Sequence, residues 1–131
     1  MKDTSNQYSA ATWDAARGEM IVALRKCAAR RGMICYSDML KQITSIRFEL
    51  DDIAYGRMLG EVSEMEDAQG RGMLSAIVVH KVGDQEPGHG FFDLAAQLGR
   101  DIRDRLRCWT DEVKLAHDVW ANRKTNINVT P

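Results

Sequence analysis

The sequence lacks the features that would assign it to a membrane, a secretory route or a disulfide-stabilised scaffold. Residues 1–10 are polar, with no apolar run behind a basic start. Neither a signal peptide nor a membrane anchor is therefore expected, and the cytoplasm is the expected location. The cysteines are odd in number and lie far apart among apolar or aromatic neighbours, which predicts reduced thiols and no disulfide. They are Cys27, Cys35 and Cys108.

An excess of charge of one sign is also missing. The net charge of −1 at pH 7 gives no overall attraction to nucleic acid or to an acidic membrane. The distribution is uneven: residues 1–31 carry six Lys and Arg against three Asp and Glu, residues 37–70 carry three against eight, and residues 99–124 carry seven against five. The acidic middle and the basic ends could pair within the fold or face different partners, and internal pairing is the favoured interpretation.

Length and composition predict one domain. With 131 residues, of which 44% are hydrophobic and 28% are charged, the chain can bury a core of its own. We expect residues 11–123 to form a single, mainly helical α+β domain with a short β-hairpin, in an order that also suits a winged-helix arrangement. The polar segments 1–10 and 124–131 are expected to be flexible tails.

The first third of the chain contains the pattern of a long helix. Apolar residues recur at spacings of three and four after Thr12, whose hydroxyl can cap the helix. Gly32 is expected to end the helix in the left-handed conformation. Residues 33–36 then indicate a brief strand or extended link, and Ser37 is expected to cap a short helix that follows.

Residues 45–50 and 51–70 carry two different patterns. In the first segment apolar and charged side chains alternate, as in a half-buried strand or an extended loop. Asp51 or Asp52 is then expected to begin a helix that ends at Gly70. The side chains expected to face inward are Ile53, Tyr55, Leu59, Val62 and Met65, and those expected to face outward are Glu61, Glu64, Glu66 and Asp67.

Residues 73–79 give the strongest strand signal in the chain. This continuous apolar run between glycines indicates a strand covered on both faces at the centre of the core. Several Gly and Pro residues within 82–90 predict a turn, after which Phe91 and Phe92 return toward the strand as a hairpin or wing. A helical pattern then extends to about Asn122, and Gly99 is expected to kink or break it.

The one polar cluster that could act as a catalytic site follows this strand. Imidazole and carboxylate groups on a turn could hold a divalent metal ion that activates water. Their spacing matches no established ligand motif, so a solvated loop is the favoured interpretation, and neither a metal nor a cofactor is predicted. No serine or cysteine lies in the context of an activated nucleophile, and no catalytic residue is predicted. The cluster comprises His80, Asp84, Glu86, His89 and Asp93.

Two groups of cations could contact phosphates. In the second group aspartates alternate with the arginines, and opposite charges one turn apart are typical of a solvated helix face that pairs with itself. The cations therefore do not by themselves predict nucleic-acid binding. The first group is Arg25, Lys26, Arg30 and Arg31, and the second is Arg100, Arg103, Arg105 and Arg107.

Gly32, Tyr36, Leu40 and the pair Val78–Val79 carry a resemblance to a known family. In alkylguanine-DNA alkyltransferases and their catalytically inactive relatives, a Gly-x-x-x-Tyr-x-x-Leu helix start precedes a recognition helix and a strand that ends in Val-Val. The order of expected elements between residues 32 and 80 resembles the winged-helix, DNA-binding part of these proteins. The resemblance implies a winged-helix fold and contact with DNA.

Two departures from that family limit what the resemblance implies. Where the alkyltransferases have Pro-Cys-His-Arg before the valines, this chain has Leu74–Ile77, so the nucleophile is absent and alkyl transfer is not implied. The segment that corresponds to the recognition helix, residues 52–69, is acidic and would repel phosphate. Residues 70–92 and the helix after them also resemble small uncharacterised bacterial proteins, and that resemblance implies no activity.

The sequence favours a non-enzymatic binding module that docks a partner protein, as small bacterial regulators, inhibitors and immunity proteins do. An acidic face on a nearly neutral chain suits a basic partner protein better than nucleic acid. Two alternatives stay open: a winged-helix-like protein that binds nucleic acid through the arginine groups, and a metal-dependent hydrolase centred on His80, Asp84 and His89. The oligomeric state also stays open. The expected partner-binding residues are Glu61, Glu64 and Asp67 on the acidic helix and His80, Lys81 and His89 at the turn.

Overall fold

Helices make up most of the part of the chain that the structure describes. The structure is a computed structural model, and it describes residues 2–81 and 87–122. Two short strands accompany the helices, so the prediction of a mainly helical α+β domain is confirmed. In chain order the elements are the 3₁₀ helix η1 (Ser5–Gln7), α1 (Ala10–Ala29), β1 (Ile34–Cys35), α2 (Tyr36–Lys41), α3 (Ile53–Ala68), the 3₁₀ helix η2 (Leu74–Ile77), β2 (Val78–Val79), α4 (His89–Gln97) and α5 (Arg105–Ala121).

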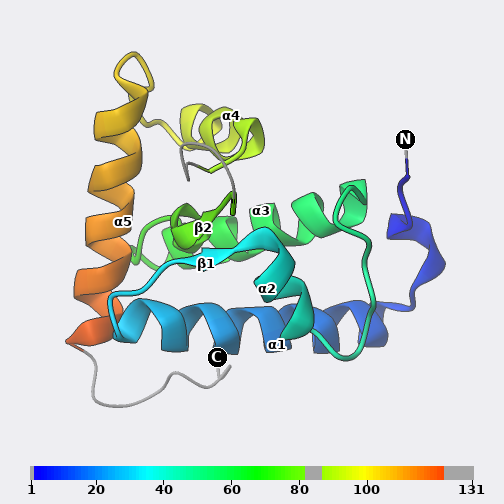
Figure 1. Ribbon diagram of the computed structural model, residues 1–131. Coiled ribbons are helices and arrows are strands. Elements are labelled where there is room, and N and C mark those ends of the chain that lie inside the picture. The colour runs from blue at the N-terminus through cyan, green and yellow to red at the C-terminus, as the bar shows by residue number, and fades with distance from the viewer. Residues whose placement is uncertain (1, 82–86, 123–131) are drawn as a thin grey trace.

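The helices surround the segment that carries η2 and β2 (Figure 1). α1 and α3 run across the molecule, and α5 stands across one end of both. η2 contacts α1, α3 and α5, whereas α4 packs against α3. The segment that the sequence places at the centre of the core therefore does lie there.

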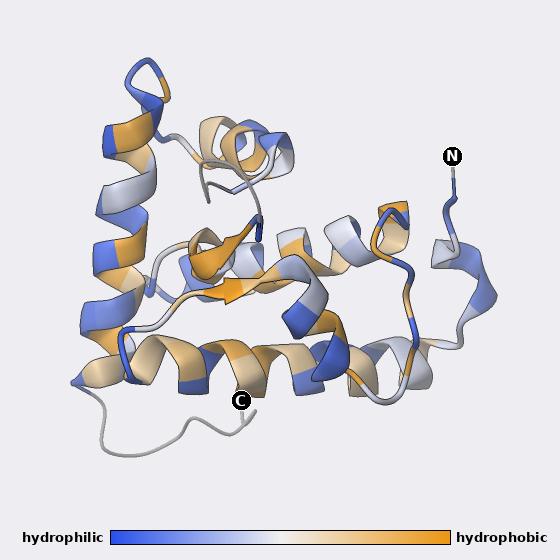
Figure 2. Ribbon diagram, in the orientation of Figure 1, coloured by the Kyte–Doolittle hydropathy of each residue, from blue (hydrophilic) through white to orange (hydrophobic). Residues whose placement is uncertain are grey.

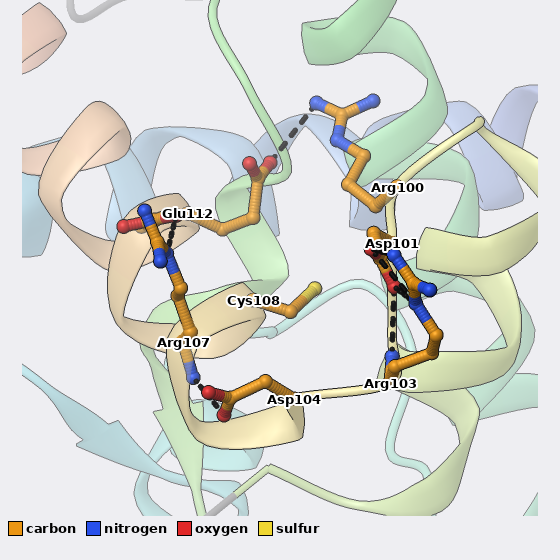
Figure 3. Close-up of a pocket in the computed structure, with 8 residues that line it drawn as sticks. Arg100, Asp101, Arg103, Asp104, Arg107, Cys108 and Glu112 are labelled. Atoms are coloured by element: carbon orange, nitrogen blue, oxygen red, sulfur yellow. Dashed lines mark hydrogen bonds and ion pairs between the residues drawn. The ribbon is translucent and has the colours of Figure 1, made fainter.

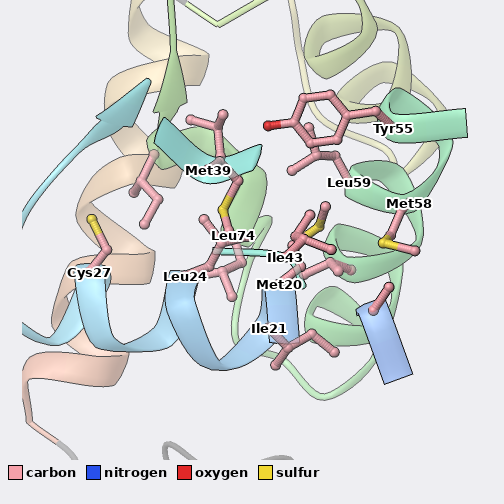
Figure 4. Packing of buried hydrophobic residues seen from close by; sticks show 14 of the residues in the cluster. Met20, Ile21, Leu24, Cys27, Met39, Ile43, Tyr55, Met58, Leu59 and Leu74 are labelled. Carbon is pink, nitrogen blue, oxygen red and sulfur yellow. The ribbon is translucent and has the colours of Figure 1, made fainter. Parts of the chain in front are cut away.

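Two clusters of buried side chains pack against this central segment. The larger joins α1, α2 and α3 and includes Met20, Met39 and Leu59 (Figure 4). The smaller joins η2 to α4 and the start of α5, and includes Phe92 and Cys108. The two strands are apolar over their whole length (Figure 2); β2 is buried, and β1 is partly buried.

The predicted strand over residues 73–79 is mostly a different structure. Only its last two residues form strand β2, and the four residues before them form η2. Ser75 N–H donates to the Ser63 hydroxyl of α3 at 2.9 Å rather than to a neighbouring strand. A buried 3₁₀ helix produces the same continuous apolar run as a buried strand, so the pattern does not separate the two.

The predicted hairpin over residues 74–92 is wrong. β2 pairs with β1, and the two strands are parallel. Phe91 and Phe92, expected on a returning strand, lie on the buried face of α4 instead. Among the described residues there is consequently no antiparallel wing, and residues 82–86, where the turn is predicted, lie outside the described part of the chain.

Three helices end in a left-handed turn. Gly70 after α3 has a φ of 72° and Gly99 after α4 has a φ of 90°, which confirms both predicted ends. After α1, however, Arg31 takes this conformation with a φ of 55°. Gly32 follows it in a confined position, where a Cβ atom would lie 3.2 Å from Cys27 Sγ and would make a tight contact.

The N-terminal segment is not the flexible tail that the sequence predicts. Thr4 is buried, and its N–H and hydroxyl both donate to the Asp52 carboxylate, at 3.0 and 2.6 Å. The same carboxylate caps α3 by accepting from Ala54 N–H at 3.0 Å. The helix cap predicted at Asp51 or Asp52 is therefore Asp52, and it also holds the start of the chain.

The other helix starts differ by a few residues from prediction. Ser9 caps α1 by accepting from Thr12 N–H at 3.1 Å, and α2 begins at Tyr36, one residue before Ser37. Residues 45–50 form no strand, and the three cysteines are free, as predicted. No helix within the described residues is both long and apolar enough to cross a bilayer. The predicted C-terminal tail, residues 124–131, lies outside the described residues.

The inner face of α3 is rotated slightly from the predicted one. Ile53 and Met65, predicted to face inward, are 38% and 44% exposed, although the other three predicted positions are buried. Glu66, predicted to face outward, is 1% exposed. It lies one turn after the buried Val62 and so continues the same inward stripe.

Candidate functional site

The acidic residues of α3, which the sequence predicts as a docking face, mostly bind arginines of the same chain. Glu61 Oε1 accepts from Trp13 Nε1 at 2.8 Å and from Arg17 Nη1 at 2.6 Å. Asp67 accepts from Arg100 Nη2. Glu64 is exposed. α3 therefore does not present a continuous, uncompensated acidic surface.

Glu66 lies at the centre of a buried ion cluster. Its carboxylate accepts from Arg25 Nε at 3.0 Å, from Arg25 Nη2 at 2.7 Å and from Arg71 Nε. Both guanidinium groups lie over the Trp120 ring, 4.5 and 5.5 Å from its centroid. Arg25 is 6% exposed, so it belongs to the core and not to a phosphate-binding surface.

These contacts confirm that the acidic middle of the sequence pairs with the basic ends. α1 contributes Arg17 to Glu61 and Arg25 to Glu66, and the loop before α5 contributes Arg100 to Asp67. Three ion pairs thus connect segments that are far apart in the sequence.

A hollow of about 400 Å³ at the start of α5 contains three of the arginines predicted to bind nucleic acid (Figure 3). Arg100 Nη2 lies 3.0 Å from Glu112 Oε1, an oxygen that also accepts from Met73 N–H at 3.2 Å. Its hydrogen bond to Asp67, with a further one to Glu112, raises the pKa of the Arg100 guanidinium. We call this site the arginine hollow, and its lining is Arg100, Asp101, Arg103, Asp104, Arg107, Cys108, Asp111 and Glu112.

The outer arginines of the hollow also face carboxylates. Arg103 donates to Asp101 through Nε at 3.0 Å and Nη2 at 2.6 Å. These hydrogen bonds lower the pKa of the Asp101 carboxyl. Arg107 Nε lies 3.9 Å from Asp111 Oδ2. The hollow is therefore a mixed, largely self-neutralised surface.

The remaining predicted cations do not extend this surface. Arg105 lies over the Phe92 ring, 5.1 Å from its centroid. Arg31 pairs with Asp118, near the other end of α5, at 2.9 Å. Lys26 and Arg30 are exposed near the C-terminal end of α1. The two arginine groups thus lie at opposite ends of α5 and do not form one row.

A different kind of hollow lies where the two parallel strands end. The register aligns Cys35 with Val79, so Tyr36 and His80 leave the sheet side by side, with ring centroids 5.0 Å apart. The carboxyl edge of parallel strands is where α/β proteins commonly bind ligands. We call this hollow, of about 270 Å³, the Tyr36 pocket, and its lining is Tyr36, Ser37, Leu50, His80, Lys81 and Gly88.

Both the side chain and the backbone of Tyr36 form hydrogen bonds with other segments. Its hydroxyl oxygen accepts from Gly88 N–H at 3.0 Å, and its carbonyl accepts from the Tyr55 hydroxyl at 2.7 Å. Burial raises the pKa of the Tyr36 phenol above 10, although the Gly88 N–H offsets part of this effect, so the hydroxyl keeps its proton at neutral pH. No described residue accepts that proton, and the hydroxyl can therefore donate to a ligand.

The polar groups around the Tyr36 pocket are all able to donate hydrogen bonds. The His80 ring and the Lys81 ammonium join the Tyr36 hydroxyl, and no Asp or Glu is among the described lining residues. The Ser37 hydroxyl also lines the pocket, but it lies 3.4 Å from Cys35 Sγ and is engaged there. Leu50, which is 59% exposed, supplies an apolar wall. This composition is the opposite of that of the arginine hollow.

A third hollow, of about 290 Å³, has Tyr36 in its lining, as the Tyr36 pocket does. It lies between α3 and α4 and is kept open by the absence of side chains at three glycines. A Cβ atom at Gly56 or Gly90 would meet nothing within 4 Å. We call it the α3–α4 groove, and its lining is Tyr36, Gly56, Leu59, Gly60, Ser75, Gly90, Phe91, Asp93, Leu94 and Gln97.

The structure brings together part of the predicted site. His80 and Lys81 line the Tyr36 pocket, and His89 lies next to its wall at Gly88, exposed as the first residue of α4. Glu61, Glu64 and Asp67 do not line either hollow at this edge. Asp84 and Glu86 lie outside the described residues, and within those described no group of three or more His, Cys, Asp or Glu is placed to hold a metal ion.

Sequence reasoning missed Tyr36, Ser37 and Leu50 as site residues. Tyr36 and His80 are 44 positions apart, and only the parallel pairing of β1 with β2 makes them neighbours. Two short apolar segments, each followed by polar residues, were the available signal, because the carboxyl ends of parallel strands meet at one edge. The predicted hairpin pairs residues 73–79 with the segment after them, so it does not bring Tyr36 next to His80.

Comparisons of the chain with protein-family models, with curated proteins and with solved structures give no match.

Proposed function

We propose that this chain is a non-enzymatic binding module that docks a segment of a partner protein across the Tyr36 pocket and the α3–α4 groove. The observation that carries the proposal is that Tyr36 lines both hollows, so a segment that passes this residue would reach each of them. A partner segment could occupy both at once. The groove lies between α3 and α4, whereas the pocket combines the start of α2 with the residues that follow β2 and precede α4.

An exposed apolar residue at the rim favours a protein partner. Leu50 is 59% exposed beside Tyr36 and His80, so a partner that covers it removes apolar surface from water. The floor of the α3–α4 groove adds Leu59 and Phe91, which are largely buried. An apolar side chain of the partner would remove this surface from water.

The acidic face of α3 is not part of the proposed docking surface. Arg17 and Arg100 already bind Glu61 and Asp67, so a basic partner would have to compete with internal ion pairs. The sequence favours a basic partner that binds the acidic helix. We propose instead that the partner docks beside His80 and Lys81, where the described lining is not acidic. A small regulator, inhibitor or immunity protein of the cytoplasm would work in this way, and the three free thiols suit that compartment.

Selection of peptides tests this proposal without knowledge of the natural partner. A library of random 12-residue peptides displayed on phage is selected against the full chain, and the enriched peptides are measured against wild type and Gly56→Phe. Because Gly56 lines the groove and a Cβ atom there meets nothing within 4 Å, the phenylalanine side chain is placed to occupy the groove. We expect binding to weaken at least about tenfold.

The matched control is Glu64→Gln on the same helix, which changes an exposed residue outside both hollows. Its peptide affinity should stay within about twofold of wild type. Unchanged melting temperatures would show that both variants are folded. Equal binding to wild type and to Gly56→Phe, or no enriched peptide at all, would contradict the proposal.

A further inference from the structure

We infer that the Tyr36 pocket receives a carboxylate, the side chain of an Asp or Glu in the docked partner segment, next to an apolar partner residue that packs on Leu50. This inference rests on the proposed function and specifies the chemistry of the partner. The juxtaposition that supports it is a set of three hydrogen-bond donors without a described acceptor, on Tyr36, His80 and the cationic Lys81, around a hollow whose described lining has no acidic residue.

The donors are supplied by two segments that the parallel sheet holds together. Tyr36 follows β1, and His80 and Lys81 follow β2. A carboxylate has two oxygens and accepts about four hydrogen bonds, so several donors converging on one hollow match it better than a neutral group. Hydrogen bonds to an ionised acceptor are also about twice as strong as neutral ones.

The Tyr36 hydroxyl is oriented toward such an acceptor by its own hydrogen bond. Because its oxygen already accepts from Gly88 N–H at 3.0 Å, the proton of the hydroxyl points elsewhere. Tyr36 lines the pocket and is the first residue of α2. A carboxylate oxygen in the pocket would complete its hydrogen bonding.

Gly88 gives a ligand access to these groups. A Cβ atom at this position would lie 3.3 Å from the Tyr36 hydroxyl oxygen and 3.6 Å from His80 Nε2. Any side chain here would thus occupy the space in front of both donors. The glycine leaves that space open for an oxygen of the partner.

The charges nearby favour an anion. Lys81 forms no ion pair with any described residue, although its charge acts on Asp38 at longer range. Asp38 itself is engaged by the Cys35 thiol at 3.1 Å and by Lys41 Nζ at 3.4 Å. An acidic partner residue would therefore meet an ammonium group that no other side chain of the described fold neutralises by direct contact.

The experiment uses the peptides selected on the full chain. A peptide displayed at the free end of a phage coat protein has no free C-terminus, so any enriched carboxylate belongs to a side chain. We expect the enriched peptides to share an Asp or Glu beside an apolar residue. Synthetic versions with that acid replaced by Asn or Gln should bind the wild-type chain at least about tenfold more weakly.

The variant Lys81→Gln then identifies where the acid binds. In this variant the preference for the acidic peptide over its amide counterpart should fall from about tenfold to about threefold or less. Lys41→Gln, on the same helix as Tyr36 but outside the pocket, should keep the full preference. Lys81 is exposed, so its replacement leaves the fold unaffected.

The outcomes separate the inference from the proposed function. Peptides that depend on the groove, yet show no acidic residue or keep their acid preference in Lys81→Gln, would overturn the inference and leave the proposed function standing. The absence of any peptide that discriminates wild type from Gly56→Phe would overturn both. An acid preference that disappears in Lys81→Gln and persists in Lys41→Gln supports both.

Discussion

The arginine hollow and the Tyr36 pocket are both polar, but they differ in how their hydrogen-bonding groups are satisfied. In the arginine hollow every arginine of the lining faces a carboxylate, and the charges belong to the fold (Figure 3). In the Tyr36 pocket the lining offers donors without acidic partners. The number of charges at a site is therefore a poor guide to binding, and the number left without a partner is a better one.

The ion pairs of the arginine hollow also differ in how far they are exposed to solvent. Arg103 and Asp101 are 91% and 60% exposed, where an ion pair contributes little to stability. Arg100 and Glu112 are 22% and 9% exposed, and Glu112 also accepts from the backbone of Met73. Breaking this second pair leaves a carboxylate largely shielded from water, which is costly.

The largest expected effect is therefore the loss of Arg100. Arg100→Met removes the partner of both Asp67 and Glu112 and should lower the free energy of unfolding by about 2–3 kcal/mol, less than for a fully buried pair because Arg100 is partly exposed. Urea unfolding measures the change. Arg103→Met, as the matched control, should cost within about 0.5 kcal/mol. Equal losses in the two variants would contradict a structural role specific to Arg100.

The second effect separates stability from binding in the Tyr36 region. Gly56→Ala should raise the free energy of unfolding by about 0.5–1 kcal/mol, because alanine favours the helix and its Cβ meets no neighbour. The same methyl narrows the α3–α4 groove and should weaken the selected peptides by about threefold. A variant that gains stability and keeps full peptide affinity would show that the groove is not the binding surface.

A second glycine, Gly99, provides a control for the opposite effects of Gly56→Ala on stability and on peptide binding. Gly99→Ala changes a residue with a φ of 90°, which an alanine adopts only with strain. It should lower the free energy of unfolding by about 1 kcal/mol and leave peptide affinity unchanged, because Gly99 lines neither hollow. Chemical unfolding and peptide titration on the same samples distinguish the two glycines.

A third effect tests whether the arginine hollow is neutralised by its own carboxylates. At about 150 mM salt, the wild-type chain should bind a duplex of 20 base pairs no more tightly than about 100 µM. The double variant Asp101→Asn with Asp111→Asn frees Arg103 and Arg107 and should bind about threefold more tightly, with a steeper dependence on salt. Gel-shift titrations measure both. Tight, salt-dependent binding by the wild type would favour the nucleic-acid alternative.

The smallest expected effects are changes of stability with pH, one at acidic pH from Asp101 and one at alkaline pH from Tyr36. Arg103 lowers the pKa of Asp101, so the stabilisation from this pair is present above the ordinary carboxyl value of 3.8 and is lost as the pH falls below it. Burial raises the pKa of Tyr36 above 10, so stability from its protonated form is present below pH 10 and is lost as the pH rises further.

Side-chain carbon shifts in NMR spectra measure both titrations. The pKa of the Asp101 carboxyl should lie below 3.8 in the wild type and should rise in Arg103→Met. The Tyr36 ring should titrate above pH 10. A Tyr36 phenol that ionises below its ordinary value would contradict its role as a neutral donor at physiological pH.

Much of the fold follows from local patterns in the sequence. The spacing of apolar residues predicts α1, α3 and α5, and the ends at Gly70 and Gly99 follow from the left-handed conformation that glycine adopts easily. Internal pairing of the acidic middle with the basic ends also follows from the charge distribution. These features depend on residues close in sequence or on bulk charge, which a single sequence contains.

What depends on distant contacts could not be predicted. The apolar run of residues 73–79 fits a strand or a buried 3₁₀ helix equally well, and only its packing among three helices decides between them. Glu66 is buried because Arg25 and Arg71 compensate its charge, which no local pattern encodes. The candidate site was half predicted, through His80 and Lys81, because its other wall depends on a parallel register.

The most direct test of the Tyr36 pocket as the docking site is a map of amide shift changes in the full chain when a selected acidic peptide is added. The largest changes should fall on Ser37, Leu50, Gly56 and Gly88, and the amides of Arg103 and Arg107 should not move. Changes centred on the arginine hollow, or on Glu61 and Glu64 of α3, would contradict the account.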